Sequence, residues 1–580
     1  MKNAYEKQVP AAAVLKPHTK KEDAHMNYQK YTRMYHPVPL ENREWPNKEI
    51  TKAPIWCSVD LRDGNQALYS PMTIDEKIEF FQYLVKLGFK EIEVGFPAAS
   101  HTEFDFVRRL IDENLIPDDV TIQVLTQARK HIIAKTVESL RGVKQAIIHL
   151  YNSTSTLQRK VVFKKSKEEI KQLAVDGAKL VTSMVSELMT DEKIRYEYSP
   201  ESFTCTEPEY AVEITNAVLD VFKPTADRKV IINLPETIQV ATPNVYADQI
   251  EYMCKHLNNR ENLIISLHAH NDRGTGVAST ELGILAGADR VEGTLFGNGE
   301  RTGNADIITV ALNMFSQGTD PELNIDQIDD VIEKYEKFNK LPINPRHPYA
   351  GEMAYVAFSG SHQDAIKKSF DLFEEEGSTT WANPYLTIDP KDIGRKYEPI
   401  LINSQSGKGG VSYIMESKYG YILPKEMLPE FATIINDMSD EKQTVLTNHE
   451  IHVAFKDTYV NIVEPIKTKF YRTQHEEDNS TTIAATVEYK GRVTMIQGKG
   501  NGPLDALCNG LRKYLNVSFE ISSYHEHALS RSSSSKAAAY ISIKTCDDEI
   551  FWGAGVDENI NTASIYALIS AVNKKLQNTK

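Results

Sequence analysis

Cysteine is scarce in this sequence and follows no pattern. The five cysteines are scattered along 580 residues, and no two of them form a C-x-x-C motif. This distribution argues against a disulfide framework and against a zinc ribbon, and it fits a reducing compartment. We therefore expect a cytoplasmic protein.

Long apolar runs and an excess of positive charge are also missing. No apolar run approaches the length of a membrane span, so we predict no membrane partner. The formal net charge is −14, which leaves no global basic surface for nucleic acid and restricts anionic ligands to local clusters of donors. Residues 1–50 lack an apolar core and include acidic side chains, so we interpret them as an N-terminal arm rather than a signal or transit peptide.

Between residues 53 and 317 the sequence alternates short apolar runs with helical patterns. Alternating strands and helices predict a parallel sheet covered by helices, and eight units in about 265 residues match the size of a (β/α)₈ barrel. An open doubly wound sheet is the alternative, although no G-x-G-x-x-G motif follows the first strand. The predicted strands are 55–60, 91–95, 121–125, 146–150, 194–198, 230–234, 263–267 and 290–294.

Two histidines follow directly on the seventh predicted strand. Side chains two residues apart on a strand share a face, so His268 and His270 aim at one point. Two neutral imidazoles on a rigid support suit a divalent metal. An isolated H-x-H pair is more often a pair of hydrogen-bonded core residues, so the choice depends on the other strand ends.

In a barrel, the carboxyl ends of all strands meet at one rim, where active sites lie. Asp63 follows the first strand and is the best further ligand, unless it only caps its own loop. Asn304, from the loop after the eighth strand and at the start of the last predicted helix (304–317), would add a carbonyl oxygen. Two nitrogen ligands and hard oxygen ligands, with some coordination positions of the metal left open, suit Mg²⁺, Mn²⁺, Zn²⁺ or Co²⁺.

An open metal site beside Arg62 suits a 2-oxo acid, whose ketone and carboxylate oxygens chelate such an ion. Arg62 would stabilise the oxyanion that forms, unless it only pairs with Glu93 or Glu300 inside the barrel. Across the rim, Glu201 would serve as a base or position one. Thr237 would donate to a substrate carboxylate.

Three motifs together resemble the alpha-isopropylmalate synthase family, whose relatives include homocitrate synthase, citramalate synthase and hydroxymethylglutaryl-CoA lyase. They are LRDGNQ at 61–66, HAHND at 268–272 and GNGERTGN at 297–304. The longer subtype of the family is similar in the segments 198–203, 234–237 and 403–410 and in the long C-terminal region. The resemblance covers about residues 30 to 575.

The resemblance implies a reaction and its participants. Acetyl-CoA, as co-substrate, condenses with 3-methyl-2-oxobutanoate (2-oxoisovalerate), and thioester hydrolysis gives 2-isopropylmalate and CoA. This is the first committed step of leucine biosynthesis, with leucine as feedback inhibitor. The implied cofactor is a divalent ion, Mg²⁺, Mn²⁺ or Zn²⁺.

The resemblance also assigns residues by position. Glu201, His362 and Tyr397 match groups implicated in removing the methyl proton and in enolate or hydrolysis chemistry, with the base left open. His362 alone would be interpreted as a surface histidine. The metal site matches Asp63, His268, His270 and Asn304, and the substrate contacts match Arg62 beside the ketone and Thr237.

We expect four parts: the arm 1–50, the catalytic barrel 51–320, a helical linker region 321–440 and a C-terminal α+β regulatory domain 441–580. The last carries an internal repeat of ββα type, in which a strand leads through a Gly-x-Gly turn into a helix. The resemblance implies a homodimer, whose linker region reaches over the partner's barrel. It also implies a leucine site in the repeat, which otherwise would be purely structural. The matched positions are Gly500, Asn501, Gly502, Pro503, Ala506, Gly555 and Ala563.

Rival functions remain at this stage. A homocitrate or citramalate synthase would share the metal site and differ in pocket shape, although the subtype segments favour an isopropyl group. A lyase has no evident use for the C-terminal repeat. A non-catalytic amino-acid sensor is disfavoured, because a decayed site would not keep every candidate ligand and Arg62.

Overall fold

The computed structural model describes most of the chain, as two compact units. One unit holds residues 1–354 with 392–395, and the other holds 355–391 and 396–580. Residues 1–27 of the predicted arm and 403–407 of the subtype segment lie outside the described residues. The described ranges are 28–189, 193–357, 359–397, 408–442, 444–529 and 535–578.

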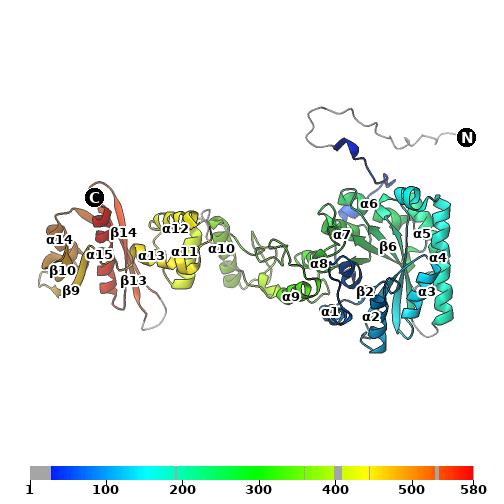
Figure 1. Cartoon of the computed structure of the whole chain (residues 1–580). Helices are drawn as coiled ribbons and strands as arrows, with labels where there is room; N and C mark the ends of the chain where they lie inside the picture. The colour runs from blue at the N-terminus through cyan, green and yellow to red at the C-terminus, as the bar shows by residue number, and fades with distance from the viewer. Residues whose placement is uncertain are drawn as a thin grey trace, which may run out of the picture. The chain divides into compact units, whose positions relative to one another are not determined.

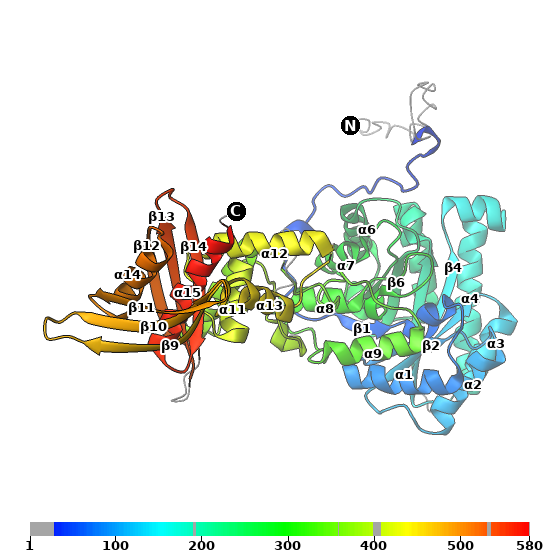
Figure 2. The ribbon, with the colours of Figure 1, turned by 60° about the vertical axis from the view of Figure 1, so that its left-hand side comes forward.

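Eight parallel strands close into a barrel in the first unit, which confirms the predicted fold and rules out the open sheet (Figures 1 and 2). The last strand pairs with the first, in the register Trp56 to Val291. The strands are β1 (Ile55–Ser58), β2 (Glu91–Gly95), β3 (Thr121–Gln127), β4 (Gln145–Ser153), β5 (Lys193–Glu201), β6 (Val230–Glu236), β7 (Leu263–Ala269) and β8 (Arg290–Gly293).

Helices surround this barrel and explain its apolar strands. Every residue of β2, β6 and β7 is buried, because parallel strands are covered by helices outside and by packed side chains inside. The helices are α1 (Ile74–Leu87), α2 (His101–Asp112), α3 (Lys130–Ser139), α4 (Lys167–Leu188), α5 (Pro208–Phe222), α6 (Pro243–His256), α7 (Gly276–Leu285), α8 (Ile307–Phe315) and α9 (Ile328–Asn339).

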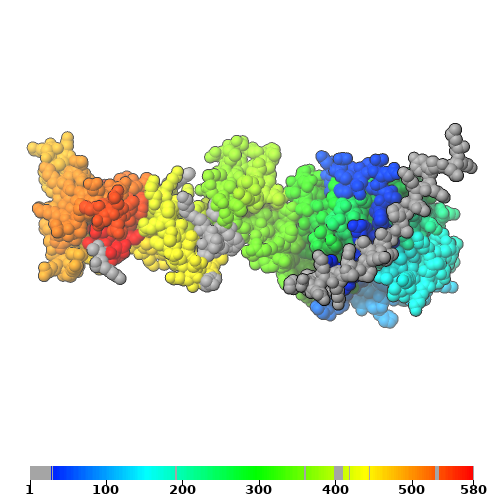
Figure 3. Space-filling model, turned by 90° about the horizontal axis from the view of Figure 1, so that it is seen from above, coloured from blue at the N-terminus to red at the C-terminus, as the bar shows by residue number. Residues whose placement is uncertain are grey.

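The described part of the arm lies on the outside of the barrel (Figure 3). Arg43 makes two hydrogen bonds to Asp248 on α6, at 2.7 and 2.8 Å. The backbone N–H groups of Glu44 and Trp45 donate to Glu251 on the same helix, at 3.0 Å each. These contacts hold residues 43–45 of the arm against α6.

The second unit begins with helices and ends in two three-stranded antiparallel sheets, ordered β11-β10-β9 and β12-β13-β14. Each sheet is followed by one helix, so the repeat is βββα, with one strand more than predicted. Its elements are α10 (Gly360–Glu376), α11 (Lys408–Tyr419), α12 (Leu428–Lys442), α13 (Asn448–Tyr459), β9 (Ile466–His475), β10 (Thr481–Tyr489), β11 (Arg492–Gly500), α14 (Pro503–Leu515), β12 (Phe519–Ala528), β13 (Ala537–Thr545), β14 (Ile550–Asp557) and α15 (Ile560–Asn578).

The predicted Gly-x-Gly turns are wrong, because these glycines lie inside β11 and β14. The helix that follows each strand passes directly over its glycine. A Cβ on Gly498 would lie 1.9 Å from the carbonyl oxygen of Ala506, and one on Gly555 would lie 1.9 Å from that of Ala563. Glycine is therefore required for close helix–strand packing and not for a turn.

None of the helices in the described part of the chain combines the length and hydropathy that a membrane span needs.

Candidate active site

A cavity of about 380 Å³ opens at the carboxyl ends of the barrel strands. Its lining combines side chains from several strand ends, as expected for a (β/α)₈ barrel. The structure therefore brings together residues that are up to 239 positions apart in the sequence, from Arg62 to Arg301. The predicted site residues that line it are Arg62, Asp63, Glu201, Thr237, His268 and His270.

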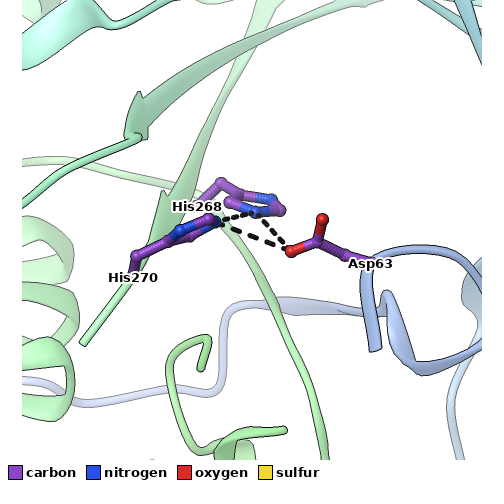
Figure 4. Close-up of side chains that lie close together, drawn as sticks. All are labelled: Asp63, His268 and His270. Carbon is purple, nitrogen blue, oxygen red and sulfur yellow. Dashed lines mark hydrogen bonds and ion pairs between the residues drawn. The ribbon is translucent and has the colours of Figure 1, made fainter. Parts of the chain in front are cut away.

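Asp63, His268 and His270, which are part of this lining, face one another (Figure 4). The Nε2 atoms of the two histidines are 3.3 Å apart, and they lie 3.5 and 3.6 Å from Oδ2 of Asp63. All three side chains are buried. Two nitrogens and one oxygen thus converge on a single point from two separate strand ends.

An unsatisfied oxygen at this point fits a cation, and a second lies on Asn304, which pairs with His270. Oδ2 of Asp63 and Oδ1 of Asn304 are both buried without a hydrogen-bond partner. Leaving such atoms unpaired costs about 1–3 kcal/mol each, more for a charged group. A divalent ion would satisfy the Asp63 oxygen and bind both imidazoles, so the residues present suit a metal with nitrogen and oxygen ligands.

A glycine-rich loop brings Asn304 to this place. Asn304 lies in the loop after β8, as predicted, and forms an isolated β-bridge with His270. The helix predicted to start at residue 304 begins only at Ile307 (α8). The loop before it folds tightly on itself: a Cβ on Gly303 (φ +95°) would lie 1.8 Å from the carbonyl oxygen of Gly297. The compact loop, rather than helix formation, positions the amide.

The electrostatics of the cluster favour a positive charge. Burial opposes ionisation of Asp63, but Arg62 and the two imidazoles outweigh it and hold the pKa of Asp63 well below its usual value. Burial also opposes protonation of His268, but Asp63 and Glu292 raise its pKa to about 9. Burial lowers the pKa of His270. The negative groups around His268 thus favour a positive charge at this point.

Arg62 connects the cluster to the barrel interior. Its Nη1 donates to Oδ1 of Asp63 at 2.5 Å, and its Nε donates to Glu93 on β2. The pairing with Glu93 that the sequence left as an alternative role is therefore present. It does not remove Arg62 from the site, because the guanidinium still lines the cavity. Instead it fixes where the guanidinium points.

Glu201 and Thr237 lie on the opposite side of the mouth from β1. Glu201 ends β5 and accepts a hydrogen bond from Ser153, and its carboxylate is part of the lining. Oγ1 of Thr237 accepts from the backbone N–H of Ser202 at 2.9 Å. Its hydroxyl proton therefore remains to donate to a ligand.

His362 and Tyr397 belong to the second unit and are not among the residues that line the cavity. His362 lies in the first turn of α10, exposed, and its ring stacks on Tyr385 with centroids 4.0 Å apart. Burial raises the pKa of Tyr397 to about 12. Tyr397 follows directly on Arg395 and Lys396, where the chain passes from one unit to the other.

Of the residues matched to leucine binding, Ala506 and Ala563 fall at equivalent places of the βββα repeat. Gly500, Asn501, Gly502 and Pro503 lead from β11 into α14, and the backbone N–H of Asn501 donates to Asp505 at 2.9 Å. Ala506 and Ala563 are fully buried on the two helices, each over the glycine described above. Gly555 lies in β14.

A layer of charged residues inside the barrel is not among the residues predicted from the sequence. His149 lines the cavity, and Glu93, Arg290 and Glu292 are buried in the barrel without being part of its lining. A signal was available, because charges two residues apart in a strand otherwise predicted as buried, as in Arg290-Val291-Glu292, must share its inner face.

Comparison with known proteins gives matches along almost the whole chain. Three family models match in order: HMGL-like at residues 53–334, alpha-isopropylmalate synthase post-catalytic domain-like at 352–416, and LeuA allosteric (dimerisation) domain at 445–576. The 2-isopropylmalate synthase of Clostridium acetobutylicum is 56% identical over 559 residues, covering 95% of this chain and 99% of that protein. That of Acetoanaerobium sticklandii is 52% identical over 560 residues, covering 96% and 98%.

Proposed function

The chain belongs to the 2-isopropylmalate synthase family, and on that premise we propose how its barrel mouth carries out the family reaction. The methyl carbon of acetyl-CoA attacks the ketone carbon of 3-methyl-2-oxobutanoate. Water then cleaves the thioester, which releases CoA and 2-isopropylmalate, a precursor of leucine. The observation that carries this proposal is the convergence of Asp63, His268 and His270 beside Arg62.

We assign the metal site to Asp63, His268, His270 and Asn304, with Mg²⁺, Mn²⁺ or Zn²⁺ as the cation. When bound, the cation polarises the ketone of the 2-oxo acid as a Lewis acid. The guanidinium of Arg62 donates to the oxygen that becomes an alkoxide as the carbon–carbon bond forms. The Thr237 hydroxyl donates to the carboxylate of the 2-oxo acid.

The thioester methyl group is a weak acid, so its proton must pass to a base as the new bond forms. We assign Glu201, His362 and Tyr397 to this transfer and to the later hydrolysis. Glu201 lines the cavity and is the candidate from the barrel itself. The proton removed from the methyl group balances the one that the alkoxide takes up to become the tertiary hydroxyl of the product.

The cavity lining favours an isopropyl group over an acidic arm. Phe96, Leu125 and Pro235 contribute apolar surface to it. The arginines of the lining, Arg62 and Arg301, are already paired with carboxylates, on Asp63 and Asp272 respectively. A homocitrate synthase would need a further cation for the second carboxylate of its substrate, because an unpaired buried charge is costly.

A thiol-release assay with a panel of 2-oxo acids tests the proposal. With acetyl-CoA, we expect kcat/KM for 3-methyl-2-oxobutanoate to exceed that for pyruvate by at least about tenfold, since each extra buried methyl group contributes about 1–3 kcal/mol. Turnover with 2-oxoglutarate should be negligible. We expect leucine to inhibit. A preference for 2-oxoglutarate would favour a homocitrate synthase, and a preference for pyruvate would favour a citramalate synthase. Absence of thiol release with every 2-oxo acid would favour a non-catalytic amino-acid sensor.

We further propose that the protein is a cytoplasmic homodimer in which His362 and Tyr397 serve the partner's barrel. The match of residues 445–576 to a dimerisation domain and the five free cysteines support this assignment. Leucine would bind at the repeated glycine–helix contacts, through the segment 500–503 with Ala506 and the Gly555–Ala563 pair.

Mixing two inactive variants tests the shared site. Neither Asp63→Asn nor His362→Ala should turn over alone. After the two are unfolded and refolded together, part of the activity should return, because a mixed dimer keeps one intact site. Recovery is measured by thiol release, and native mass spectrometry counts the mixed dimers. Mixed dimers without activity would mean that His362 serves its own barrel, and full activity of His362→Ala alone would remove it from the chemistry.

A further inference from the structure

The barrel interior next to the cavity is charged. In barrels of this kind, branched aliphatic side chains usually fill the inner layers. Here Glu93, His149, Glu197, Arg290 and Glu292 are each less than 4% exposed. Burying such groups does not stabilise a fold unless they are paired, and even paired groups are often no better than apolar ones. The layer therefore calls for a role beyond stability.

Glu292 is the most constrained member of this layer. Its Oε2 accepts hydrogen bonds from Nδ1 of His268 at 2.7 Å and from Nδ2 of Asn233 at 3.1 Å. Its Oε1 accepts from Nη1 of Arg290 and from Nε2 of Gln123, both at 2.8 Å. Four donors from four strands hold the two oxygens, so the carboxylate cannot rotate without losing a buried hydrogen bond.

The sheet register places this carboxylate behind the metal site. His268 on β7 lies opposite Glu292 on β8, so both side chains leave the same face of the barrel. Because Glu292 accepts the Nδ1 proton of His268, the ring directs Nε2 toward Oδ2 of Asp63 and Nε2 of His270 (Figure 4). His270 has no such acceptor on its Nδ1, which instead meets the guanidinium of Arg301.

We propose that Glu292 is a positioning residue, which fixes the orientation and tautomer of His268 and thereby sets the affinity of the barrel mouth for its cation. The inference rests on the metal site of the proposed function. A ligating histidine binds through an unprotonated nitrogen, and an acceptor on its other nitrogen keeps the proton there. His268 is then the preorganised ligand of the site, to which Asp63, His270 and Asn304 add.

A second cation within the layer is the competing interpretation, since one atom each of Glu93, His149 and Glu292 lies within reach of a common point. The amide of Gln123 argues against it. Its Nε2 lies 2.6 Å from Oε2 of Glu93, 2.8 Å from Oε1 of Glu292 and 3.3 Å from Nδ1 of His149. A neutral donor thus already occupies the space among the three groups.

Glu292→Gln would disturb the tautomer of His268 while nearly keeping the shape of the side chain at position 292. Its amide has a single oxygen to face four donors. If that oxygen keeps the bonds to Arg290 and Gln123, the NH₂ group faces Nδ1 of His268, and two donors meet. The ring must then move its proton to Nε2 or rotate, and either change removes the nitrogen that binds the metal.

Glu197 offers a matched control in the same layer. It is fully buried, and its ion-pair contacts are to His149 and Arg290, at 3.3 and 3.5 Å. Burial and the nearby Glu292 raise the pKa of Glu197 well above its usual value, which favours the neutral acid. Glutamine at position 197 resembles this neutral acid and leaves the contact between Glu292 and His268 intact.

Cobalt binding to the full-length protein tests the proposal without measuring activity. We expect one Co²⁺ per chain by isothermal titration calorimetry, with loss of binding in His268→Ala. Glu292→Gln should bind Co²⁺ about 10–100-fold more weakly and show an altered visible ligand-field spectrum. Glu197→Gln should match the wild type in both. Glu292→Asp keeps the charge but retracts the carboxylate by one methylene group, and it should weaken binding as well.

The outcomes separate this inference from the proposed function. Wild-type affinity and spectrum in both Glu292 variants would overturn the positioning role and leave the metal site intact. No Co²⁺ binding by the wild type, or undiminished binding by His268→Ala, would overturn the metal site and the inference with it. If the Glu292 variants do not fold, an NMR spectrum of the wild type tests the positioning role instead. The protein is labelled with ¹⁵N-histidine and loaded with Zn²⁺. The Nδ1 of His268, assigned by its loss in His268→Ala, must carry a proton, and a bare Nδ1 would refute the proposal.

Discussion

Replacing Asp63 by asparagine will lower kcat at least about 10³-fold, because activation of a ketone by a bound cation contributes several kcal/mol, at about 1.4 kcal/mol per tenfold change in rate. Asparagine keeps the size of the side chain and removes the charge that Oδ2 directs at the two imidazoles. Thiol release with saturating acetyl-CoA and 3-methyl-2-oxobutanoate measures the loss. Circular dichroism should show an unchanged fold, since Asp63 lies at the rim and not in the apolar core.

Asp248→Asn is the matched control for this substitution. Asp248 is equally buried, but it pairs with Arg43 on the outer surface of the barrel and does not line the cavity. Its variant should keep wild-type kcat. A chelator should inactivate the wild type reversibly, with recovery on adding Mg²⁺, Mn²⁺ or Zn²⁺. Near-normal turnover of Asp63→Asn in the presence of chelator would exclude a metal role for this cluster.

Replacing Arg62 by lysine will lower kcat/KM about 10²–10³-fold, the loss expected when one donor to a developing oxyanion is removed. Lysine keeps the positive charge but has no planar fork, so it cannot contact Asp63 and Glu93 together while it faces the substrate. Because the alkoxide forms only during reaction, most of the loss should appear in kcat rather than KM. Steady-state kinetics over both substrates separates the two.

Arg159→Lys is the control for Arg62→Lys, because it alters a buried arginine ion pair that lies outside the cavity lining. Arg159 is 7% exposed and pairs with Glu207 at 2.7 Å, away from the cavity lining. Its variant should lose some thermal stability and keep its catalytic constants. Equal kinetic losses in the two variants would mean that Arg62 acts through folding alone.

The barrel and the histidine pair were predictable from local pattern. Apolar runs such as 230–234 and 263–267 can be read as buried strands, and their bounds agree with β6 and β7 to within two residues. The spacing of His268 and His270 already implied a shared direction, because side chains two apart on a strand lie on one face. The barrel topology then indicated that Asp63, on another strand, ends at the same rim.

Features that depend on neighbours distant in sequence were not predictable in the same way. Glu292 stands alone in the sequence, and its contacts with His268, Gln123 and Asn233 exist only after the barrel has closed. β9 gave no apolar signal, because most of its side chains are exposed. The glycines of β11 and β14 were interpreted as turns, whereas their role is to let a helix backbone pass close by, which local sequence does not encode.

Anomalous diffraction from crystals grown with Mn²⁺ tests the central claim most directly, because it locates the cation without reference to activity. The structure predicts one strong peak per chain, about 2.0–2.3 Å from a carboxylate oxygen of Asp63 and from one nitrogen each of His268 and His270. Well-ordered density for these three side chains with no peak between them, or a peak only among Glu93, His149 and Glu292, would contradict the account.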